Sequence, residues 1–362
     1  MARVVLAMSG GVDSSVAAAL LQSAGYEVIG LFMRHGTQLE EACQVTPSGK
    51  QTCCSATDAA DARRVADRLD IPFYVLDFQE PFTRIIDYFV DEYIHARTPN
   101  PCIVCNTWLK FGKLFEYADD IGAEYVATGH YAQLVDTDEG GRALLRGIDD
   151  TKDQTYALFG IDRDKLDRIL LPIGEHRKNQ IRRQAEALEL SVADKPDSQE
   201  ICFIPDQDHA RFIRDYYQAK DAPQPETSGP IVTVDGTVVG EHNGFERFTI
   251  GQRKGLRVAM GDPYFVVRIE PETCSVVIGP HESLAREELF ASETNWLIDP
   301  PEQPIEAEVK IRYRSRPAKA TVVPLAARRT HVQFAEPCYG IAPGQAAVFY
   351  EGNRLLGGGW IE

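Results

Sequence analysis

Apolar and polar positions in the first 130 residues alternate in a pattern of short strands and longer helices. Four apolar runs are expected to form strands: Val4–Met8, Val28–Met33, Phe73–Phe78 and Tyr125–Thr128. Helical stretches lie between them, such as the alanine-rich run Val16–Ala24 and the stretch Ser55–Leu69, where Asp58 strengthens the helix start. The alternation predicts an α/β fold, a doubly wound parallel sheet with helices on both faces.

The pattern changes near Gly229 to short strands separated by turns. Ile231–Val234 and Thr237–Val239 flank Asp235-Gly236, a dipeptide that strongly favours a hairpin. We therefore expect three domains: the α/β domain over 1–205, a small middle domain over 206–285 and a C-terminal β-barrel over 286–362.

The segment Ser9-Gly10-Gly11-Val12-Asp13-Ser14-Ser15 joins the first expected strand to the first helix. Two glycines let the backbone turn tightly, and the helix that follows presents unpaired N–H groups and its positive dipole end to an anion such as phosphate. The segment lacks the Gly-Lys-Ser/Thr ending of a Walker A loop, so its donors must be backbone amides and the hydroxyls of Ser9, Ser14 and Ser15. Asp13 is expected to help hold Mg²⁺ on the phosphates. A glycine-rich turn that binds nothing is the simpler alternative.

Composition narrows the class of protein. The 362 residues are 44% hydrophobic, and no apolar run is long enough to cross a bilayer, which favours a cytoplasmic protein without a membrane partner. The net charge of −16 argues against nonspecific binding to nucleic acid, although it allows a local basic face. Eight cysteines without a secretion signal are interpreted as thiols, metal ligands or catalytic groups.

Two cysteine segments are candidates for chemistry. Thr98–Asn106 contains Cys102-x-x-Cys105 beside two prolines, which should exclude a regular helix and hold both sulfurs on a loop. Spacing alone fits half of a zinc site, a redox pair or part of an iron–sulfur site. Cys202 lies between apolar residues on an expected short strand, where a buried, inert thiol is the simpler interpretation. His35–Cys54 has no clear period and is expected to be a mobile lid loop.

Basic residues gather in three groups. Lys310, Arg312, Arg314 and Arg316 fall at every second position, so on a strand they would share one face. The other groups lie in the middle domain and on an expected helix: Arg247, Arg253, Lys254 and Arg257, and Arg177, Lys178, Arg182 and Arg183. A solvated edge that discourages aggregation is one interpretation of the first group, and a surface for RNA phosphates is the other.

Six motifs follow one another along the chain. They are Ser9–Ser15, Asn100-Pro101-x-x-x-Cys105-Asn106, Thr128–Tyr131, Lys152–Tyr156, Asp197–Phe203 and Gly251–Gly255. The first resembles the signature of the PP-loop ATP pyrophosphatases, whose domain is Rossmann-like, and the ordered set resembles the bacterial tRNA-specific 2-thiouridylases over nearly the whole chain. The resemblance implies an ATP-dependent enzyme that replaces the 2-oxygen of the wobble uridine in tRNA by sulfur, forming 2-thiouridine.

The resemblance also implies roles for single residues. Cys105 matches the nucleophile and Cys202 the persulfide-bearing cysteine, which would receive sulfur from a cysteine desulfurase or a sulfur-relay protein. The implied ATP contacts are Ala7, Met8, Ser9, Gly10, Gly11, Val12, Asp13, Ser14, Met33 and Gly129. The implied contacts to tRNA, including the target base in the anticodon loop, are Asn100, Pro101, Cys102, His130, Lys152, Asp153, Gln154, Arg312, Tyr313 and Gln345.

Cys102 departs from the pattern, because many relatives carry aspartate after the Asn-Pro pair. Three thiols, those of Cys102, Cys105 and Cys202, then stand at the expected site, and three thiolates can hold a 4Fe–4S cluster with one open iron. The same three could instead be a nucleophile, a persulfide carrier and a spare thiol.

Two rival functions stay open on the sequence alone. Another PP-loop enzyme, such as an amide- or argininosuccinate-forming synthetase, would need the loop but no paired cysteines. A tRNA-binding or iron–sulfur carrier protein would have a nucleotide-sensing domain and no turnover.

Overall fold

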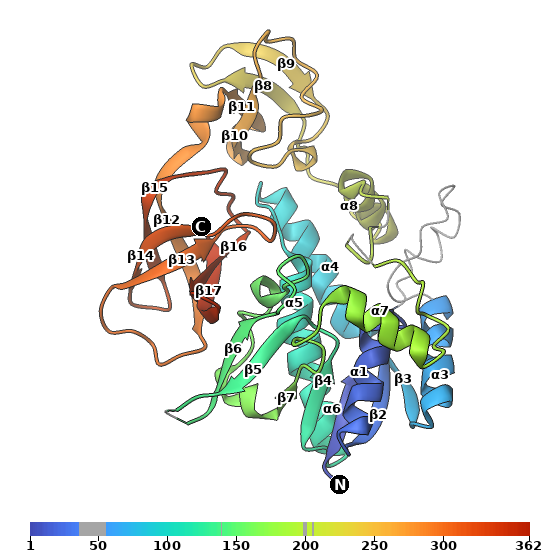
Figure 1. The fold of residues 1–362 in the computed structure, drawn as a ribbon. Coiled ribbons are helices and arrows are strands. Elements are labelled where there is room, and N and C mark those ends of the chain that lie inside the picture. Colours follow the sequence, from blue (N-terminus) through green and yellow to red (C-terminus); the bar gives the residue numbers. More distant parts are fainter. Residues whose placement is uncertain (36–55, 139, 198–200, 205) are drawn as a thin grey trace.

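The computed structural model describes residues 1–35, 56–138, 140–197, 201–204 and 206–362. The expected lid loop from residue 36 onward, the helix start at Ser55 and residues 198–200 of the fifth motif, Asp197–Phe203, lie outside these ranges. Figure 1 shows three β assemblies: a parallel sheet flanked by helices, a small sheet coloured yellow to orange, and a red barrel. Within the described ranges, no helix is long and apolar enough to span a membrane.

The first assembly is a five-stranded sheet in which all neighbouring strands are parallel. Its order is β3 (Phe73–Asp77), β2 (Glu27–Arg34), β1 (Arg3–Ala7), β4 (Tyr125–Thr128) and β7 (Ile169–Leu170). The four expected strands are confirmed, whereas the two-residue β7 is too short to leave a pattern. The strand order reverses between β1 and β4, and ligands bind beyond the carboxyl ends of strands at such a point.

Helices cover both faces of this sheet, as the alternating pattern predicts. They are α1 (Val12–Ser23), α3 (Ala56–Leu69), α4 (Gln79–Ile94), α5 (Pro101–Val104), the π-helix Cys105–Lys113, α6 (Leu114–Asp120) and α7 (Lys178–Ala187). A further helix, α8 (His209–Ala219), packs against α4. Residues Val4 and Leu6 face a core with Val16 of α1 and Ile181 of α7. Val5 faces the opposite core with α6.

The second assembly is a four-stranded sheet in the order β10 (Phe265–Glu270), β11 (Ser275–Gly279), β8 (Gly229–Thr233) and β9 (Val238–His242). The hairpin expected at Asp235-Gly236 is confirmed, since β8 and β9 pair antiparallel on either side of it. Gly236 has φ +87°, a left-handed conformation that glycine adopts without strain.

The third assembly is a six-stranded barrel that closes because β12 pairs with both β15 and β17. Its strands are β12 (Ala285–Trp296), β13 (Ile305–Lys310), β14 (Ala318–Pro324), β15 (Thr330–Tyr339), β16 (Ala346–Glu351) and β17 (Arg354–Ile361). The hairpin β5 (Ala132–Asp136) and β6 (Arg142–Arg146) extends from the α/β domain and pairs with β17. Barrel residues Val348 and Tyr350 share a buried cluster with Phe115 of α6, so the barrel and the parallel sheet pack on one core. The predicted fold class is confirmed.

Candidate active site

The turn between β1 and α1 has the geometry of an anion-binding loop. Gly10 has φ +72°, and a Cβ atom there would lie 2.2 Å from the backbone oxygen of Asp58. Gly11, with an extended φ of −97°, caps α1, which begins at Val12 and so four residues earlier than expected. The unpaired N–H groups of the first turn therefore lie beyond the carboxyl ends of β1 and β4.

Serine hydroxyls in this turn are used within the turn itself. The hydroxyl of Ser15 is fully buried and donates to the carbonyl oxygen of Gly11 at 2.8 Å. The Oγ atom of Ser14 accepts from the backbone N–H of Ser9 at 3.2 Å and donates to the same carbonyl of Gly11 at 3.3 Å. The expectation that Ser15 donates to a ligand is thus wrong, because its rotamer closes the first helical turn. Backbone amides are the main donors that face outward.

The implied ATP contacts lie at neighbouring positions of the sheet. Ala7 and Met8 end β1, and Met33 lies near the end of the adjacent β2. Gly129 follows β4, and a Cβ atom there would lie 2.8 Å from the backbone nitrogen of Ser14. Glycine at this position lets the chain after β4 pass directly over the start of α1.

Asp13 is held by two side chains from distant segments. The ammonium of Lys178, the first residue of α7, lies 2.9 and 2.8 Å from the two carboxylate oxygens of Asp13. The hydroxyl of Tyr131 donates to the same carboxylate at 2.7 Å. The carboxylate of Asp13 is thus paired with a lysine, and its expected role in holding Mg²⁺ on the phosphates stays a prediction. Among the described residues, no group of three or more His, Cys, Asp or Glu side chains is arranged to hold a metal.

Asp197 continues this network toward the segment that carries Cys202. It accepts from Lys152 at 2.6 Å, from Lys178 at 2.7 Å and from Arg182 at 3.1 Å. Burial by itself raises the pKa of Asp197, but hydrogen bonds from Lys152 and Lys178 outweigh it and leave the pKa below its usual value. Three cations expected on a tRNA surface are thus engaged in an internal ion-pair network.

A second lysine network, which sequence reasoning missed, links the turn Ser9–Ser15 to α3. Lys195 donates to the carbonyl of Gly10 at 2.9 Å and pairs with Asp58 and Asp61 of α3 at 2.6 and 2.5 Å. Burial lowers the pKa of Lys195, yet these carboxylates raise it overall. One sequence signal could have revealed this network: two aspartates lie three residues apart on the face of α3 that also carries the buried alanines.

The first cysteine segment is helical, contrary to the expected loop. The side chain of Asn100 caps α5 by accepting from the N–H of Ile103 at 3.3 Å, and Pro101 occupies the first helical position. Proline is tolerated there because that residue's N–H would have no helical partner. The helix continues as the π-helix that begins at Cys105, which is half-buried, while Cys102 is exposed.

Cys202 lies in a turn and not on the expected strand. It packs at the border of the buried cluster formed by Phe82 and Phe89 of α4, and Cys105 borders the same cluster. The fold therefore brings two cysteines that are far apart in sequence to one hydrophobic cluster beside α4.

Cys102 faces a different neighbourhood. Burial raises the pKa of the Tyr313 hydroxyl, and the charges of Asp153 and Cys102 raise it further, which places Cys102 near these two residues. Because Cys102, Cys105 and Cys202 do not form a metal-holding group, their arrangement does not fit a 4Fe–4S cluster.

Three of the implied tRNA contacts serve the internal structure after β4. His130 is buried and bonds through Nδ1 to Thr128 Oγ1 at 2.7 Å; burial, and then the charge of Lys110, lower its pKa well below the usual value. The amide oxygen of Gln154 accepts from the N–H of Tyr131 at 2.9 Å. Asp153 accepts from the backbone and the hydroxyl of Thr155. These contacts order the chain around the phosphate loop, Ser9–Ser15.

The barrel contacts the first cysteine segment through Gln345. Its Nε2 atom donates to the carbonyls of Thr98 and Pro99 at 3.0 and 3.2 Å, and the N–H of Thr98 donates to Pro343. The residues just before Asn100 are thus held by the mouth of the barrel.

The basic segment of the barrel is a turn after β13 and not the expected strand. Ser315 closes this turn, because its hydroxyl donates to the carbonyl oxygen of Arg312 at 2.9 Å and accepts from the N–H of Arg312 at 3.2 Å. The guanidinium of Arg312 donates to the carbonyl of Gly340 at 3.1 Å. The four cations of Lys310–Arg316 therefore do not share one strand face, and the exposed Arg314 differs in role from the anchored Arg312.

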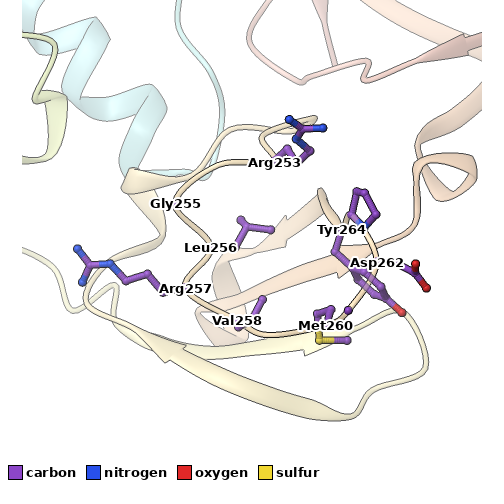
Figure 2. Close-up of a pocket in the computed structure, with 10 residues that line it drawn as sticks. Arg253, Gly255, Leu256, Arg257, Val258, Met260, Asp262 and Tyr264 are labelled. Atoms are coloured by element: carbon purple, nitrogen blue, oxygen red, sulfur yellow. The ribbon is translucent and has the colours of Figure 1, made fainter.

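A separate pocket of about 430 Å³ opens in the middle β assembly (Figure 2). Its lining residues are Arg253, Gly255, Leu256, Arg257, Val258, Met260, Gly261, Asp262, Pro263 and Tyr264. Among them Leu256 is buried, whereas Arg253 and Arg257 are exposed. The loop that carries them approaches the barrel, since a Cβ atom at Gly251 would lie 3.2 Å from the guanidinium of Arg312.

A family model matches each of the three β assemblies. Residues 2–206 match the tRNA methyl transferase HUP domain, residues 218–280 the tRNA methyl transferase PRC-barrel domain, and residues 286–361 the aminomethyltransferase beta-barrel domain. The parallel sheet with its phosphate loop thus defines a HUP-domain protein carrying two further β domains.

Relatives of full length narrow this class. A tRNA-specific 2-thiouridylase of Rhodopirellula baltica is 52% identical over 100% of this chain and 96% of its own. The enzymes of the same name from Carboxydothermus hydrogenoformans and Clostridium perfringens are 48% and 49% identical over 99% of this chain and 97% and 98% of theirs. The chain belongs to the tRNA-specific 2-thiouridylase family. A solved 4-thiouridine synthetase–RNA complex aligns with 15% identity over 61% of this chain and 51% of its own, at a TM-score of 0.37, which is too low to add to the argument.

Proposed function

We propose that the protein is an ATP-dependent enzyme that converts the wobble uridine of tRNA into 2-thiouridine. The observation that carries the proposal is the joint placement of Cys105 and Cys202 on one buried cluster, in a chain whose phosphate loop ends the central strand of the parallel sheet. The full-length relatives named for this activity support the choice of substrate. A synthetase that only needs the loop would have no use for the two cysteines.

The first step activates a poor leaving group. The 2-oxygen of the uridine attacks the α-phosphate of ATP, so a new O–P bond forms and pyrophosphate leaves. Backbone N–H groups at the start of α1 stabilise the phosphate charge, and Gly10 lets the backbone approach it. Mg²⁺ would enter with ATP as its counter-ion.

The second step transfers sulfur. The terminal sulfur of a persulfide on Cys202 attacks C2 of the base, and AMP leaves with the former 2-oxygen. The Cys105 thiolate then attacks the inner sulfur of Cys202, which leaves the terminal sulfur on the base and forms a Cys105–Cys202 disulfide. An external dithiol reductant restores the two thiols, and a cysteine desulfurase or sulfur-relay protein renews the persulfide. A disulfide requires Cα atoms within about 7 Å, so this step needs the two cysteines that border one cluster to come into direct contact.

The tRNA substrate is expected to contact several parts of the chain. Asn100, Pro101 and Cys102 form a helix start at which Cys102 is exposed, and Gln345 holds the residues that precede it. The exposed Tyr313 of the barrel lies near Cys102, and the exposed Arg314 follows it in the chain. An unstacked base of the anticodon loop could enter between these elements.

Mass spectrometry of tRNA tests the function directly. Unmodified tRNA, ATP, Mg²⁺, a persulfide donor and a dithiol are incubated with the protein, and 2-thiouridine is expected at the wobble position only when ATP is present. Cys105→Ser and Cys202→Ser should each abolish 2-thiouridine while part of the ATP cleavage survives, since activation precedes sulfur transfer. Cys274→Ser, in the middle β assembly, is the control and should retain activity. Unmodified tRNA after complete incubation with the parent protein would contradict the proposal.

Metal analysis tests whether an iron–sulfur cluster is bound. Because the three thiols do not form a metal-holding group, we expect anaerobically purified protein to be colourless, free of iron and sulfide, and active. Cys102→Asp should then be tolerated. Stoichiometric iron that is required for activity would contradict this expectation.

A further inference from the structure

The phosphate loop has no cation of its own. Neither lysine nor arginine occurs between Arg3 and Arg34, a stretch that includes β1, the loop and all of α1. Two lysines from later segments reach the loop, Lys178 and Lys195. Figure 1 shows α7, which begins with Lys178, lying across α1, and both helices share a buried core.

The two lysines contact the loop differently. Lys195 donates to the carbonyl oxygen of Gly10 and pairs with the carboxylates of α3, so it holds the backbone of the loop in place. Lys178 pairs with the side chain of Asp13 at the start of α1, and its ammonium is mostly buried, with the side chain 12% exposed. The N–H of Lys178 also donates to Asp149 at 2.9 Å, which fixes the end of α7 beside the loop.

Each carboxylate that pairs with Lys178 has another donor. Asp13 also accepts from the hydroxyl of Tyr131 at 2.7 Å. Asp197 also accepts from Lys152 and Arg182. If one hydrogen of the Lys178 ammonium turned to a phosphate oxygen, Asp13 would keep the Tyr131 hydroxyl and Asp197 would keep two cations, so each carboxylate would still accept a hydrogen bond.

We propose that the Lys178 side chain contacts the phosphates of ATP together with the backbone N–H groups, supplying the cation that the loop lacks, and that Asp197 is a positioning residue that holds the ammonium beside the loop. The inference deepens the proposed function, because it rests on ATP as the substrate. An ammonium at this place balances the charge of the bound triphosphate and of the departing pyrophosphate.

Calorimetric binding of ATP and of adenosine separates a phosphate contact from a structural role. Lys178→Met is expected to weaken ATP binding roughly 10- to 100-fold, as expected for loss of a charge-assisted hydrogen bond, and to leave adenosine binding unchanged. Lys178→Arg should recover part of the ATP affinity. Asp197→Asn should weaken ATP binding less than Lys178→Met does. Arg183→Met is the matched control on the exposed face of α7 and should bind both ligands as the parent does.

Every outcome decides the inference. Equal ATP affinity in Lys178→Met and the parent would overturn it, and so would a parallel loss of adenosine affinity, because Lys178 would then only support the fold. A parent protein that binds adenosine and ATP equally would also overturn it. Failure of the proposed function has a different signature: the parent leaves tRNA unthiolated whatever the Lys178 variants bind.

Discussion

The phosphate loop Ser9–Ser15 and the basic segment Lys310–Arg316 are both conspicuous in the sequence, yet only the first has the local structure that its residues predict. The loop is a strand-to-helix turn, as expected, because glycines are needed where φ is positive and where Asp58 approaches the backbone. The basic segment forms a turn because Arg312 bonds to Ser315 and to Gly340, 28 residues away. A motif defined by backbone restrictions can be predicted, whereas the direction of long side chains depends on distant partners.

The largest expected effect tests the backbone side of this comparison. Gly10→Ala should lower the free energy of unfolding by about 3 kcal/mol or more, because it combines a positive φ with a Cβ atom 2.2 Å from a backbone oxygen. Urea unfolding followed by circular dichroism measures the change. Gly11→Ala is the control: its Cβ atom would meet Ser9 Oγ at 3.5 Å, an ordinary contact. Equal losses in the two variants would mean that Gly10 is not sterically required.

The second prediction concerns His130, which lies beside the loop but is buried by the tertiary structure. Its folded pKa is lowered, so the unfolded chain binds a proton that the folded chain does not once the pH falls below about 6.5. Stability should therefore decline as the pH decreases from 6.5 to 5, by up to about 1.4 kcal/mol per pH unit from this residue. His130→Gln should show a shallower decline in urea unfolding over that range. Identical pH slopes would show that His130 titrates normally.

The third prediction separates two arginines of the basic turn. Arg312→Ala should lower the free energy of unfolding by about 1 to 1.5 kcal/mol, because Gly340 loses a charged donor. Arg314→Ala should leave stability within about 0.5 kcal/mol of the parent. If Arg314 contacts a phosphate, its loss should reduce the salt slope of tRNA binding by about one. Equal effects of Arg312→Ala and Arg314→Ala on the free energy of unfolding and on tRNA binding would contradict the distinction between an anchored and an exposed arginine.

The smallest expected effect on stability concerns Gln345, which joins the barrel to the first cysteine segment. Gln345→Ala should cost about 0.5 to 1 kcal/mol of unfolding free energy, because two hydrogen bonds to Thr98 and Pro99 are lost. Its effect on the rate of 2-thiouridine formation should be larger than that on ATP cleavage, since the helix start at Asn100 is less well held. Gln333→Ala, exposed on β15 of the same barrel, is the control and should change neither rate.

Some features of the fold and the site could be predicted from particular residues, and others could not. Alternating apolar runs predicted four of the five strands of the parallel sheet, and Asp235-Gly236 predicted the hairpin of the middle assembly. The helix at Pro101 was missed because a proline inside a helix and a proline at its first position look alike until the cap, Asn100, is known. The pairing of Lys178 with Asp13 joins residues 165 positions apart, and no local pattern reveals it.

The sequence by itself determined which segments form strands, where the backbone needs glycine, and which cysteines and loop residues resemble those of a thiolating enzyme. These are local properties, because periodic burial and backbone sterics act within a few residues. Only the tertiary structure decided that Lys178 pairs with Asp13, that Lys152 and Arg182 pair with Asp197, that His130 is buried, and that Cys105 and Cys202 border one cluster. Long, flexible side chains have many partners of similar energy in the unfolded chain, and packing of the whole fold selects among them.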